Sequence, residues 1–472
     1  MSIPYAKILL NTVSGSDKMK IKIYATAQNK YRLTPLFEDN MEYINTDVIE
    51  KQGHPNDIEA CLINLHDDIE FQTFGGIGGA ITDTSATVWS NMPQNKKNEF
   101  TKAYFDKTDG IGYNLTRLSI GSCDFSCEDY TYIEENDLTL DTFDISHDLT
   151  AIFPLVKAAQ SYSDLTILAS PWSPPAYMKT NNSRIGGHLK KEYYLLWARY
   201  IKKYIESCKE NKINIWGVTI QNEPRHHQIW ESCLYSPEEE AEFLGYLGQE
   251  LLNTNVKILC YDHCRERILE RAKAIFESKS GKYCDGIANH WYSGDHFGEL
   301  KAFNTKYPQK ISFASEGCCI IPGKGIKDDY DLKFAEAYAH DICGCFNNGL
   351  HYYCDWNILL DKNNGPHHNR EGREFSAEAP VYYIKEKDEI VYRLSYYYIG
   401  HYSKFTKQGA KVISCSSYSA NIETVAFKNP NGDIVCVLLN RTDSAMNCII
   451  RLNGYIKQIE LSPHSIITAV IS

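Results

Sequence analysis

The stretch Ile213-Asn214-Ile215-Trp216-Gly217-Val218-Thr219-Ile220-Gln221-Asn222-Glu223-Pro224 joins a run of strand-forming residues to a polar end. This pattern predicts a buried strand whose carboxyl end bears one carboxylate, Glu223. A second stretch, Lys310-Ile311-Ser312-Phe313-Ala314-Ser315-Glu316-Gly317, has the same arrangement and ends on Glu316. If both strands belong to one parallel sheet, the two carboxylates lie at the same edge of that sheet.

The region from about residue 70 to residue 400 alternates short apolar runs with longer amphipathic stretches. Eight strand candidates are Phe74–Ile81, Asn114–Ile120, Leu165–Ser170, Ile213–Ile220, Lys257–Tyr261, Gly286–Trp291, Ile311–Ser315 and His351–Trp356. Strands that alternate with helices predict parallel βα units, and eight such units predict a closed (β/α)8 TIM barrel. An open doubly wound sheet is the alternative, but no GxGxxG turn follows the first strand.

Helices are predicted between these strands. The candidates are Lys191–Asn211, Ser236–Asn253 and Cys264–Ser278. The second has a well-marked start, because Ser236 can cap the helix, Pro237 suits its first position and Glu239 completes a capping box.

The two ends of the chain have a different pattern. Strand-like runs occur at Met19–Thr26, Glu59–Leu65, Ala410–Ser417, Thr424–Lys428, Ile434–Asn440, Asn447–Leu452, Ile456–Leu461 and Ser465–Ile471. Turn residues separate the later runs, which is typical of antiparallel strands. We therefore predict an accessory antiparallel β-sandwich formed by residues 1–70 and 395–472, beside a barrel of residues 71–394.

Composition limits the possible partners. The net charge of −11 argues against a nucleic-acid partner, which would select a basic surface. No window approaches the eighteen or so apolar residues of a membrane span, so no stable membrane insertion is expected. The start lacks the apolar core of a signal peptide, and sixteen Cys fit a reducing compartment, so a cytoplasmic location is predicted. The sequence sets no oligomeric state.

In a (β/α)8 barrel, catalytic groups stand at the carboxyl ends of the strands. At or just beyond these ends the sequence places polar or aromatic residues on six strands: Arg117, Asp124 and Phe125 on the second, Trp172 on the third, Asn222 and Glu223 on the fourth, His290 and Tyr292 on the sixth, Glu316 on the seventh and Trp356 on the eighth. Aromatic faces and hydrogen-bonding groups suit a sugar. Two carboxylates among them suit cleavage of a glycosidic bond.

The environments of the two carboxylates suggest their roles. A general acid must hold its proton near neutral pH, so burial and the charge of Glu316 are expected to raise the pKa of Glu223. Glu316 is the expected nucleophile, with Arg117 and Tyr292 as partners, and Asn222 is expected to reach the sugar 2-hydroxyl. Carboxyl groups about 5 Å apart indicate a retaining mechanism, and about 6.5–9.5 Å an inverting one.

We predict no cofactor and no metal. The Cys spacings lack the paired CxxC pattern of a zinc site. A metal-dependent hydrolase that uses His226, His227, His367 and His368 is an alternative, although adjacent His pairs on loops more often face solvent. Another alternative is a carbohydrate-binding protein that has lost catalysis.

The strand ends resemble glycoside hydrolase family 30, the family of retaining enzymes that includes glucosylceramidase. The resemblance covers about residues 71–405 and rests on these motifs: Phe74-Gly75-Gly76-Ile77-Gly78-Gly79-Ala80-Ile81-Thr82-Asp83, Ser122-Cys123-Asp124-Phe125-Ser126, Ala169-Ser170-Pro171-Trp172, Asn222-Glu223-Pro224, His290-Trp291-Tyr292, Phe313-Ala314-Ser315-Glu316, Asp355-Trp356-Asn357 and His401-Tyr402-Ser403-Lys404-Phe405.

The resemblance implies Glu223 as acid/base and Glu316 as nucleophile of a retaining β-glycosidase that takes a terminal β-D-glucosyl unit from a small or oligosaccharide β-glycoside. It implies sugar contacts from Asp124, Trp172, Asn222 and Trp356. Specificity for a β-xyloside, a β-1,6-glucan or a β-fucoside remains open. The loops Arg225–Trp230 and Asn364–Arg370 differ from the family pattern, and we expect them, with Trp230, to shape the site of the leaving group.

Overall fold

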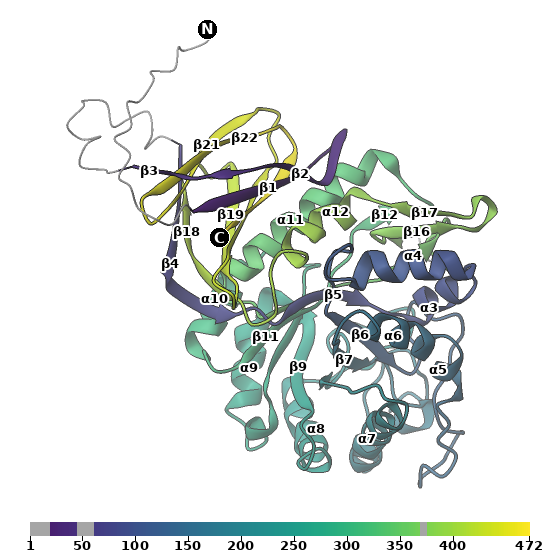
Figure 1. Cartoon of the computed structure of the whole chain (residues 1–472). Coiled ribbons are helices and arrows are strands. Elements are labelled where there is room, and N and C mark those ends of the chain that lie inside the picture. Colours follow the sequence, from purple (N-terminus) through teal and green to yellow (C-terminus); the bar gives the residue numbers. More distant parts are fainter. Residues whose placement is uncertain (1–18, 45–60, 369–374) are drawn as a thin grey trace. The chain divides into compact units, whose positions relative to one another are not determined.

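The computed structural model describes residues 19–44, 61–368 and 375–472. The chain divides into two compact units (Figure 1). One unit runs from Phe74 to Gln408, and the other combines the part of the chain before residue 74 with Gly409–Ser472. As predicted, the residues of the barrel lie in the chain between two terminal segments that together form the other unit.

The first unit is built on eight parallel strands that close into a barrel, so the predicted (β/α)8 architecture is confirmed. In barrel order the strands are β5 (Gly76–Ala80), β6 (Leu115–Ile120), β7 (Thr166–Pro171), β8 (Gly217–Thr219), β9 (Lys257–Cys264), β10 (Gly286–His290), β11 (Ile311–Glu316) and β13 (Tyr352–Asp355). Every predicted strand contributes. The fourth is shorter than predicted, because only three residues of Ile213–Ile220 pair with neighbours.

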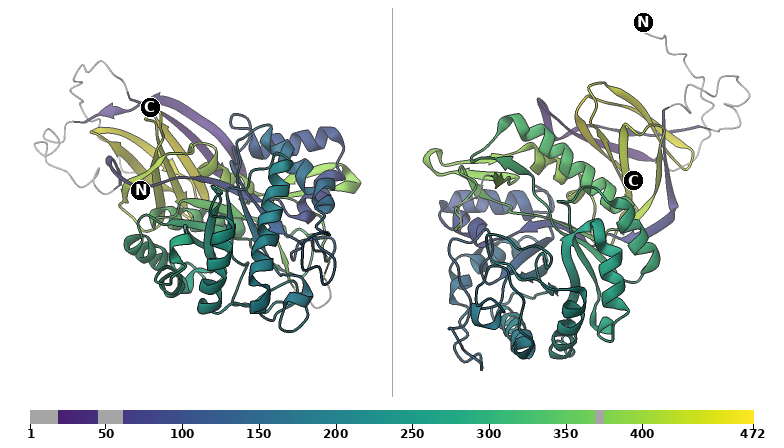
Figure 2. Two further views of the ribbon diagram at one scale, coloured as in Figure 1. Left: turned by 90° about the horizontal axis from the view of Figure 1, so that it is seen from below. Right: turned by 180° about the vertical axis from the view of Figure 1, so that it is seen from behind.

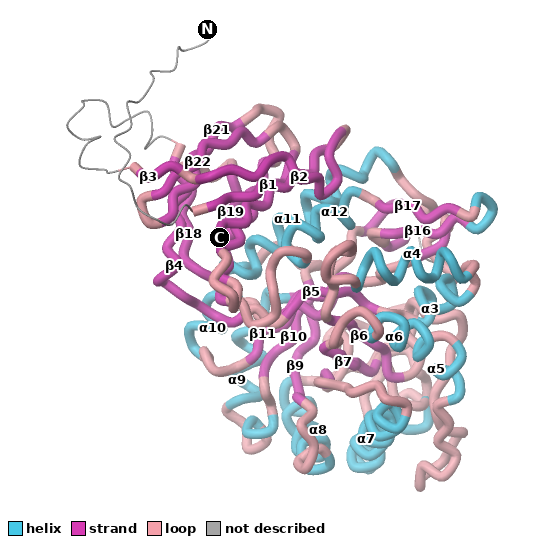
Figure 3. The backbone as a smooth tube through the Cα atoms, viewed as in Figure 1, coloured by secondary structure: helices cyan, strands magenta, loops and turns pink. Residues whose placement is uncertain are grey.

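Helices surround the barrel strands (Figure 2). Figure 3, in which helices and strands have different colours, shows the same arrangement. They are α3 (Asp83–Ser90), α4 (Gln94–Phe105), α5 (Ser146–Thr150), α6 (Ile152–Gln160), α7 (Tyr194–Glu210), α8 (Pro237–Glu250), α9 (Ile268–Phe276), α10 (Phe297–Lys306), α11 (Asp331–Asn347) and α12 (Leu394–Ser403). Amphipathic helices cover the barrel because each turns one apolar face toward the strands. Short strands β12 (Ile320–Pro322), β14 (Leu360–Asp361), β15 (Phe375–Ala377), β16 (Val381–Ile384) and β17 (Glu389–Tyr392) lie in the later loops.

The start of α8 follows its sequence signals. The Ser236 side chain accepts a hydrogen bond from the Glu239 backbone, and the Glu239 side chain accepts one from the Ser236 backbone. The predicted start of the next helix at Cys264 is wrong, because β9 runs on to Cys264 and a 3-10 turn, Arg265–Arg267, precedes α9.

The boundary after the barrel lies later than residue 394. Helix α12 belongs to the barrel unit, where the Tyr402 hydroxyl donates to the Ala339 carbonyl of α11 at 2.8 Å. The first boundary also moves, from 70/71 to 73/74, because β4 (Leu62–Thr73) extends beyond the predicted strand.

The second unit holds one ten-stranded sheet, ordered β2-β1-β23-β20-β19-β18-β4-β21-β22-β3. Besides β4, its strands are β1 (Lys20–Ala27), β2 (Lys30–Asn40), β3 (Glu42–Tyr43), β18 (Lys411–Ser417), β19 (Ile422–Lys428), β20 (Ile434–Asn440), β21 (Met446–Leu452), β22 (Tyr455–Leu461) and β23 (Ser465–Ile471). Side chains from both ends of this order, such as Ile21 and Ile450, share one apolar core. The sheet therefore folds over on itself as a sandwich.

Two details of this unit differ from the prediction, and part of one predicted strand falls outside the described residues. Strands β4 and β21 pair in parallel, whereas all other pairs in the sheet are antiparallel. Strand β2 was not predicted, because most of its residues are exposed and it lacks alternation. Residues 59 and 60 of the predicted strand Glu59–Leu65 lie outside the described residues.

Glycines let the barrel strands approach each other closely. A Cβ added at Gly78 of β5 would lie 1.8 Å from the backbone oxygen of Leu115 in β6. Backbone atoms cannot move aside without opening the barrel at this position.

We therefore expect Gly78→Ala to lower the free energy of unfolding by about 2–3 kcal/mol or to prevent folding. Urea denaturation followed by circular dichroism measures the change. Gly298→Ala is the matched control, because nothing lies within 4 Å of the added Cβ in α10. The control should stay within about 1 kcal/mol of the parent. Equal stabilities for the two variants would contradict this explanation.

Candidate active site

A fully buried guanidinium, Arg117 on β6, lies at the centre of the strand ends. Its Nη1 donates to Glu316 Oε2 at 2.5 Å. Its Nη2 donates to Asn222 Oδ1 at 2.9 Å and to Asp262 Oδ2 at 2.8 Å, and its Nε donates to Ser170 Oγ at 3.1 Å. Burial opposes a charge here, yet Asp262 and Glu316 raise the pKa of Arg117 above its ordinary value. Arg117 therefore stays charged and fixes residues in three other strands and in the turn after a fourth.

Glu316 ends β11 and is held on both of its oxygens. Arg117 occupies Oε2, and the Tyr292 hydroxyl donates to Oε1 at 2.9 Å. Tyr292 also lies 3.3 Å from Cys318 Sγ. Arg117 and Tyr292, which were the predicted partners of Glu316, therefore both contact it. Two donors on one carboxylate orient it rigidly.

Glu223 lies in the turn after β8, in left-handed backbone with φ +46°. Its backbone N–H donates to the Asp262 carbonyl at 2.9 Å. Its Oε2 accepts from Gln228 Nε2 at 2.9 Å and lies 3.6 Å from His226 Nδ1, and its Oε1 lies 3.3 Å from His290 Nδ1. The side chain is 9% exposed, so the structure nearly closes it off from solvent.

The pKa of Glu223 differs from the prediction. Burial alone would raise it, but hydrogen bonds from His226 and His290 hold it below its ordinary value. The prediction considered only burial and the charge of Glu316. It left out His226, which is three residues from Glu223 in the same turn, and it could not place His290, which comes from a different strand.

The two carboxylates are close together. One oxygen of Glu223, one oxygen of Glu316 and a ring nitrogen of His290 lie within 4.8 Å of one another. Inverting glycosidases keep their carboxyl groups about 6.5–9.5 Å apart to admit a water molecule, whereas retaining enzymes keep them about 5–5.5 Å apart. The nearer oxygens of Glu223 and Glu316 are closer together than the inverting arrangement requires.

Asp262 on β9 is a site residue that was not predicted. It is fully buried, in left-handed backbone with φ +44°, and four donors converge on it. They are Arg117 Nη2 at 2.8 Å, His290 Nε2 at 3.0 Å, Ser315 Oγ at 2.5 Å and Thr219 Oγ1 at 2.7 Å. Burial would raise its pKa, but Arg117 and His290 hold the pKa well below its usual range. The sequence feature that could have indicated Asp262 was its position at the end of the fifth strand.

His290 links the three acidic side chains. Its Nε2 meets Asp262 and its Nδ1 meets Glu223, and the same Nδ1 lies 3.9 Å from Glu316 Oε1. Burial opposes a charge on the ring, yet Glu316, Asp262 and Glu223 raise the pKa of His290 to about 9. His290 was predicted to contact substrate, but it is fully buried and both of its nitrogens face carboxylates.

Predicted aromatic residues form one wall of the site. Trp172 and Trp356 stack with their centroids 5.3 Å apart, and Phe125 meets Trp356 edge-on at 6.2 Å. Arg117 lies 4.8 Å from the Trp172 ring and 5.5 Å from the Trp356 ring. These three rings belong to one apolar cluster, against which the partly buried Trp230 packs.

Asn222 and Asp124 complete the predicted set. The Asn222 Oδ1 atom accepts from Arg117, which leaves the amide NH2 group as the part that can donate to a ligand. Asp124 follows β6, is partly buried and raises the pKa of the Cys318 thiol, after the larger effects of burial and Glu316. It therefore lies beside the same cluster.

The two loops that were expected to shape the entrance are joined. Glu231, directly after the first loop, accepts from Ser122 Oγ at 2.5 Å and lies 3.0 Å from His368 Nε2 in the second. The His368 backbone N–H donates to the Ser126 carbonyl at 2.8 Å. Residues 369 and 370 of the predicted loop lie outside the described residues.

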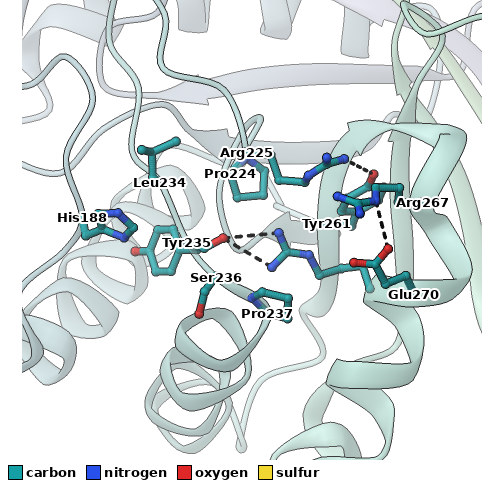
Figure 4. A pocket seen from close by; sticks show the side chains of 11 residues that line it. His188, Pro224, Arg225, Leu234, Tyr235, Ser236, Pro237, Tyr261, Arg267 and Glu270 are labelled. Atoms are coloured by element: carbon teal, nitrogen blue, oxygen red, sulfur yellow. Dashed lines mark hydrogen bonds and ion pairs between the residues drawn. The ribbon is translucent and has the colours of Figure 1, made fainter.

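A cavity of about 340 Å³ lies next to the turn that carries Glu223 but holds neither carboxylate (Figure 4). Its three arginines each have an acidic partner: Arg225 with Glu266 at 2.8 Å, Arg267 with Glu270 at 2.9 Å and Arg271 with Glu240 at 3.0 Å. Its charges are balanced within the protein, so it does not favour an anionic ligand.

None of the helices among the described residues is long and apolar enough to cross a membrane.

Comparison with known proteins agrees with this geometry. The chain matches the glycosyl hydrolase family 30 TIM-barrel domain over residues 74–406 and the family 30 beta sandwich domain over residues 409–469. The lysosomal acid glucosylceramidase of Mus musculus is 31% identical over 407 residues, which cover 81% of this chain and 77% of the relative.

One further relative has a different named activity, and one solved structure matches almost the whole chain. An endo-1,6-beta-D-glucanase of Neurospora crassa is 27% identical over 392 residues, covering 78% of this chain and 79% of the relative. The crystal structure of SrfJ from Salmonella typhimurium is 30% identical, covers 96% of this chain and 99% of that one, and superposes with a TM-score of 0.88. These matches cover both compact units of this chain. The carboxylates of Glu223 and Glu316 lie close together in the barrel. The chain therefore belongs to glycosyl hydrolase family 30 and is a glycoside hydrolase.

Proposed function

We propose that the chain hydrolyses a terminal β-D-glucosyl linkage with retention of configuration. The observation that carries this proposal is the separation within 4.8 Å between oxygens of Glu223 and Glu316. It is shorter than the separation of about 6.5–9.5 Å at which an inverting enzyme admits its water molecule, and this supports retention. The glucosyl specificity is supported by two relatives, one named a glucosylceramidase and the other an endo-1,6-beta-D-glucanase.

Glu316 is the proposed nucleophile and Glu223 the proposed acid/base. A Glu316 oxygen attacks the anomeric carbon while Glu223 gives a proton to the glycosidic oxygen, so the leaving group departs as an alcohol. Glu223 then takes a proton from water, whose oxygen attacks the same carbon and releases Glu316. Arg117 and Tyr292 hold Glu316 toward this carbon during both steps.

The proton of the acid step is supplied by a pair of groups. Glu223 and His290 lie 3.3 Å apart and share one proton below the pKa of about 9 of His290. In the empty site this proton rests on His290. As the glycosidic bond lengthens, negative charge grows on the leaving oxygen beside Glu223, and the proton passes through Glu223 to that oxygen. His290 therefore acts through Glu223 and is a positioning residue.

The sugar is proposed to lie between the carboxylates and the aromatic wall. Asn222 donates to the 2-hydroxyl, Asp124 accepts from hydroxyls farther from the bond, and Trp172, Trp356 and Phe125 bound the apolar face of the ring. Trp230, at the edge of the same cluster, is proposed to meet the leaving group.

A second candidate is hydrolysis of a β-1,6-glucan, which the Neurospora crassa relative is named for. The two candidates share the proposed nucleophile and acid/base and differ in the leaving group.

All sixteen Cys lie in the described part of the chain, none of them is in a disulfide, and thirteen of them are buried. Free thiols in this number support the predicted cytoplasmic location.

The substrate class is tested with nitrophenyl β-glycosides and a β-1,6-glucan. We expect the β-glucoside to have a kcat/KM at least tenfold above that of the β-xyloside and the β-fucoside. Faster release of oligosaccharides from the glucan than of nitrophenol from the β-glucoside would instead favour the second candidate.

The nucleophile is tested with an activated 2-deoxy-2-fluoro-β-glucoside, which slows release of the covalent intermediate. Mass spectrometry should find one glycosyl group on the peptide that contains Glu316. Glu316→Gln should show no adduct and lose at least about 10³-fold in kcat, because an amide is a poor nucleophile. Its sugar binding, measured by calorimetry, should persist. An adduct on any other carboxylate would refute the assignment.

The role of Asp262 is tested by Asp262→Asn. This change removes a negative charge 3.0 Å from His290, so the pKa of His290 should fall. The Glu223–His290 pair then loses its proton at lower pH, and the alkaline limb of kcat/KM should move down by about one unit.

Thr219→Val is the matched control for Asp262→Asn. It removes a hydrogen bond of 2.7 Å to Asp262 without changing charge. The limb should stay within a few tenths of a unit of its position in the parent. If the alkaline limb of kcat/KM does not move in Asp262→Asn, Asp262 contributes to stability alone.

A further inference from the structure

Glu223 has imidazole groups on two sides. His290 lies at Oε1, whereas His226 lies 3.6 Å from Oε2. One oxygen of Glu223 and one ring nitrogen each of His226 and His263 lie within 4.8 Å of one another. We propose that Glu223, His226 and His263 form a binding site for Zn²⁺, and that the bound ion inhibits the enzyme by holding Glu223.

The three donors come from two neighbouring segments. Glu223 and His226 lie in the turn after β8, and His263 lies in β9. The rings of His226 and His263 meet edge-on with their centroids 4.3 Å apart. The segments are held together by the hydrogen bond from the Glu223 backbone to the Asp262 carbonyl, so the donors are assembled before any ion arrives.

His263 gives an independent sign of a ligand. It is 1% exposed, and its Nδ1 has no hydrogen-bond partner among the described residues. A buried ring nitrogen without a partner is costly unless something else binds it. His226 is half-exposed on the other side of the cluster, which gives an ion access from solvent.

The distance between the donors of Glu223 and His226 suits zinc. Zinc binds imidazole nitrogen and carboxylate oxygen at about 2.0–2.2 Å, so two ligands of a tetrahedral ion lie about 3.4 Å apart. The separation of 3.6 Å between Glu223 Oε2 and His226 Nδ1 is already close to that value. Two imidazoles and one carboxylate form a set that zinc binds with a water in the fourth position, whereas Mg²⁺ and Ca²⁺ prefer oxygen ligands alone.

Inhibition follows from which oxygen the ion takes, and it rests on the proposed role of Glu223. Oε2 now accepts from Gln228 at 2.9 Å. An ion on Oε2 replaces this contact with a dication, which prevents protonation of the carboxylate. The enzyme would then lack its acid, while Glu316 and Arg117 stay in place.

Binding is tested on the full chain by equilibrium dialysis against Zn²⁺, and with Co²⁺ as a spectroscopic probe. We expect one ion bound through nitrogen and oxygen, without the charge-transfer absorption that thiolate ligands give. His226→Asn should weaken binding at least tenfold. His227→Asn is the matched control, since His227 is exposed and adjacent but lies outside the cluster, and it should bind like the parent.

Inhibition is measured with the β-glucoside, and each variant is compared with its own rate after EDTA treatment. Zn²⁺ should inhibit the parent and His227→Asn at matched concentrations, and His226→Asn should need at least tenfold more. Equal binding by the parent and His226→Asn would overturn the site. Binding at the cluster without inhibition would overturn its effect on Glu223. If no β-glucoside is hydrolysed, the proposed function fails, and dialysis still decides the site.

Discussion

The active site depends on one buried cation, Arg117. A guanidinium without solvent is stable only when carboxylates and other acceptors surround it, and removing one partner of such a pair costs about 3–5 kcal/mol. Arg117 satisfies this requirement with side chains from several barrel strands, including Glu316 and Asp262. The position of the proposed nucleophile is therefore fixed by the same contacts that make the buried charge tolerable. The contacts that set the geometry of the site are thus the same contacts that make the buried charge stable.

The backbone adds a second constraint beside it. Glu223 and Asp262 both have left-handed φ values, +46° and +44°, which cost non-glycine residues on the order of 1–3 kcal/mol each. A hydrogen bond of 2.9 Å joins the two strained residues, from the Glu223 N–H to the Asp262 carbonyl. Their side chains meet again through His290, whose two nitrogens face one carboxylate each. The proposed acid/base Glu223 is thus joined to Asp262 directly through its backbone and, through His290, by its side chain.

The barrel and its polar strand ends were predictable, because apolar runs and their polar ends are local patterns. Asp262 was not found, because the predicted fifth strand stopped at Tyr261 and nothing local distinguishes one Asp in a row of polar residues. The direction of the Glu223 pKa shift was wrong for a related reason. Burial can be inferred from a pattern, but the approach of His290 from β10 depends on how the barrel closes. Strand β2 escaped prediction because it buries no regular face.

The proposed leaving-group contact Trp230 lies in the turn after β8, close in the chain to groups that contact Glu223. The same dozen residues include the proposed acid/base Glu223, the imidazole of His226 at its second oxygen and the exposed apolar side chain of Ile229. Glu231, at the end of the turn, is tied to the loop after the eighth strand through His368. A substitution that reshapes the turn for a different leaving group therefore also moves groups that set the pKa of Glu223. With the proposed roles, leaving-group preference and proton transfer change together in this barrel, whereas the proposed nucleophile Glu316 is held by other groups, Arg117 and Tyr292.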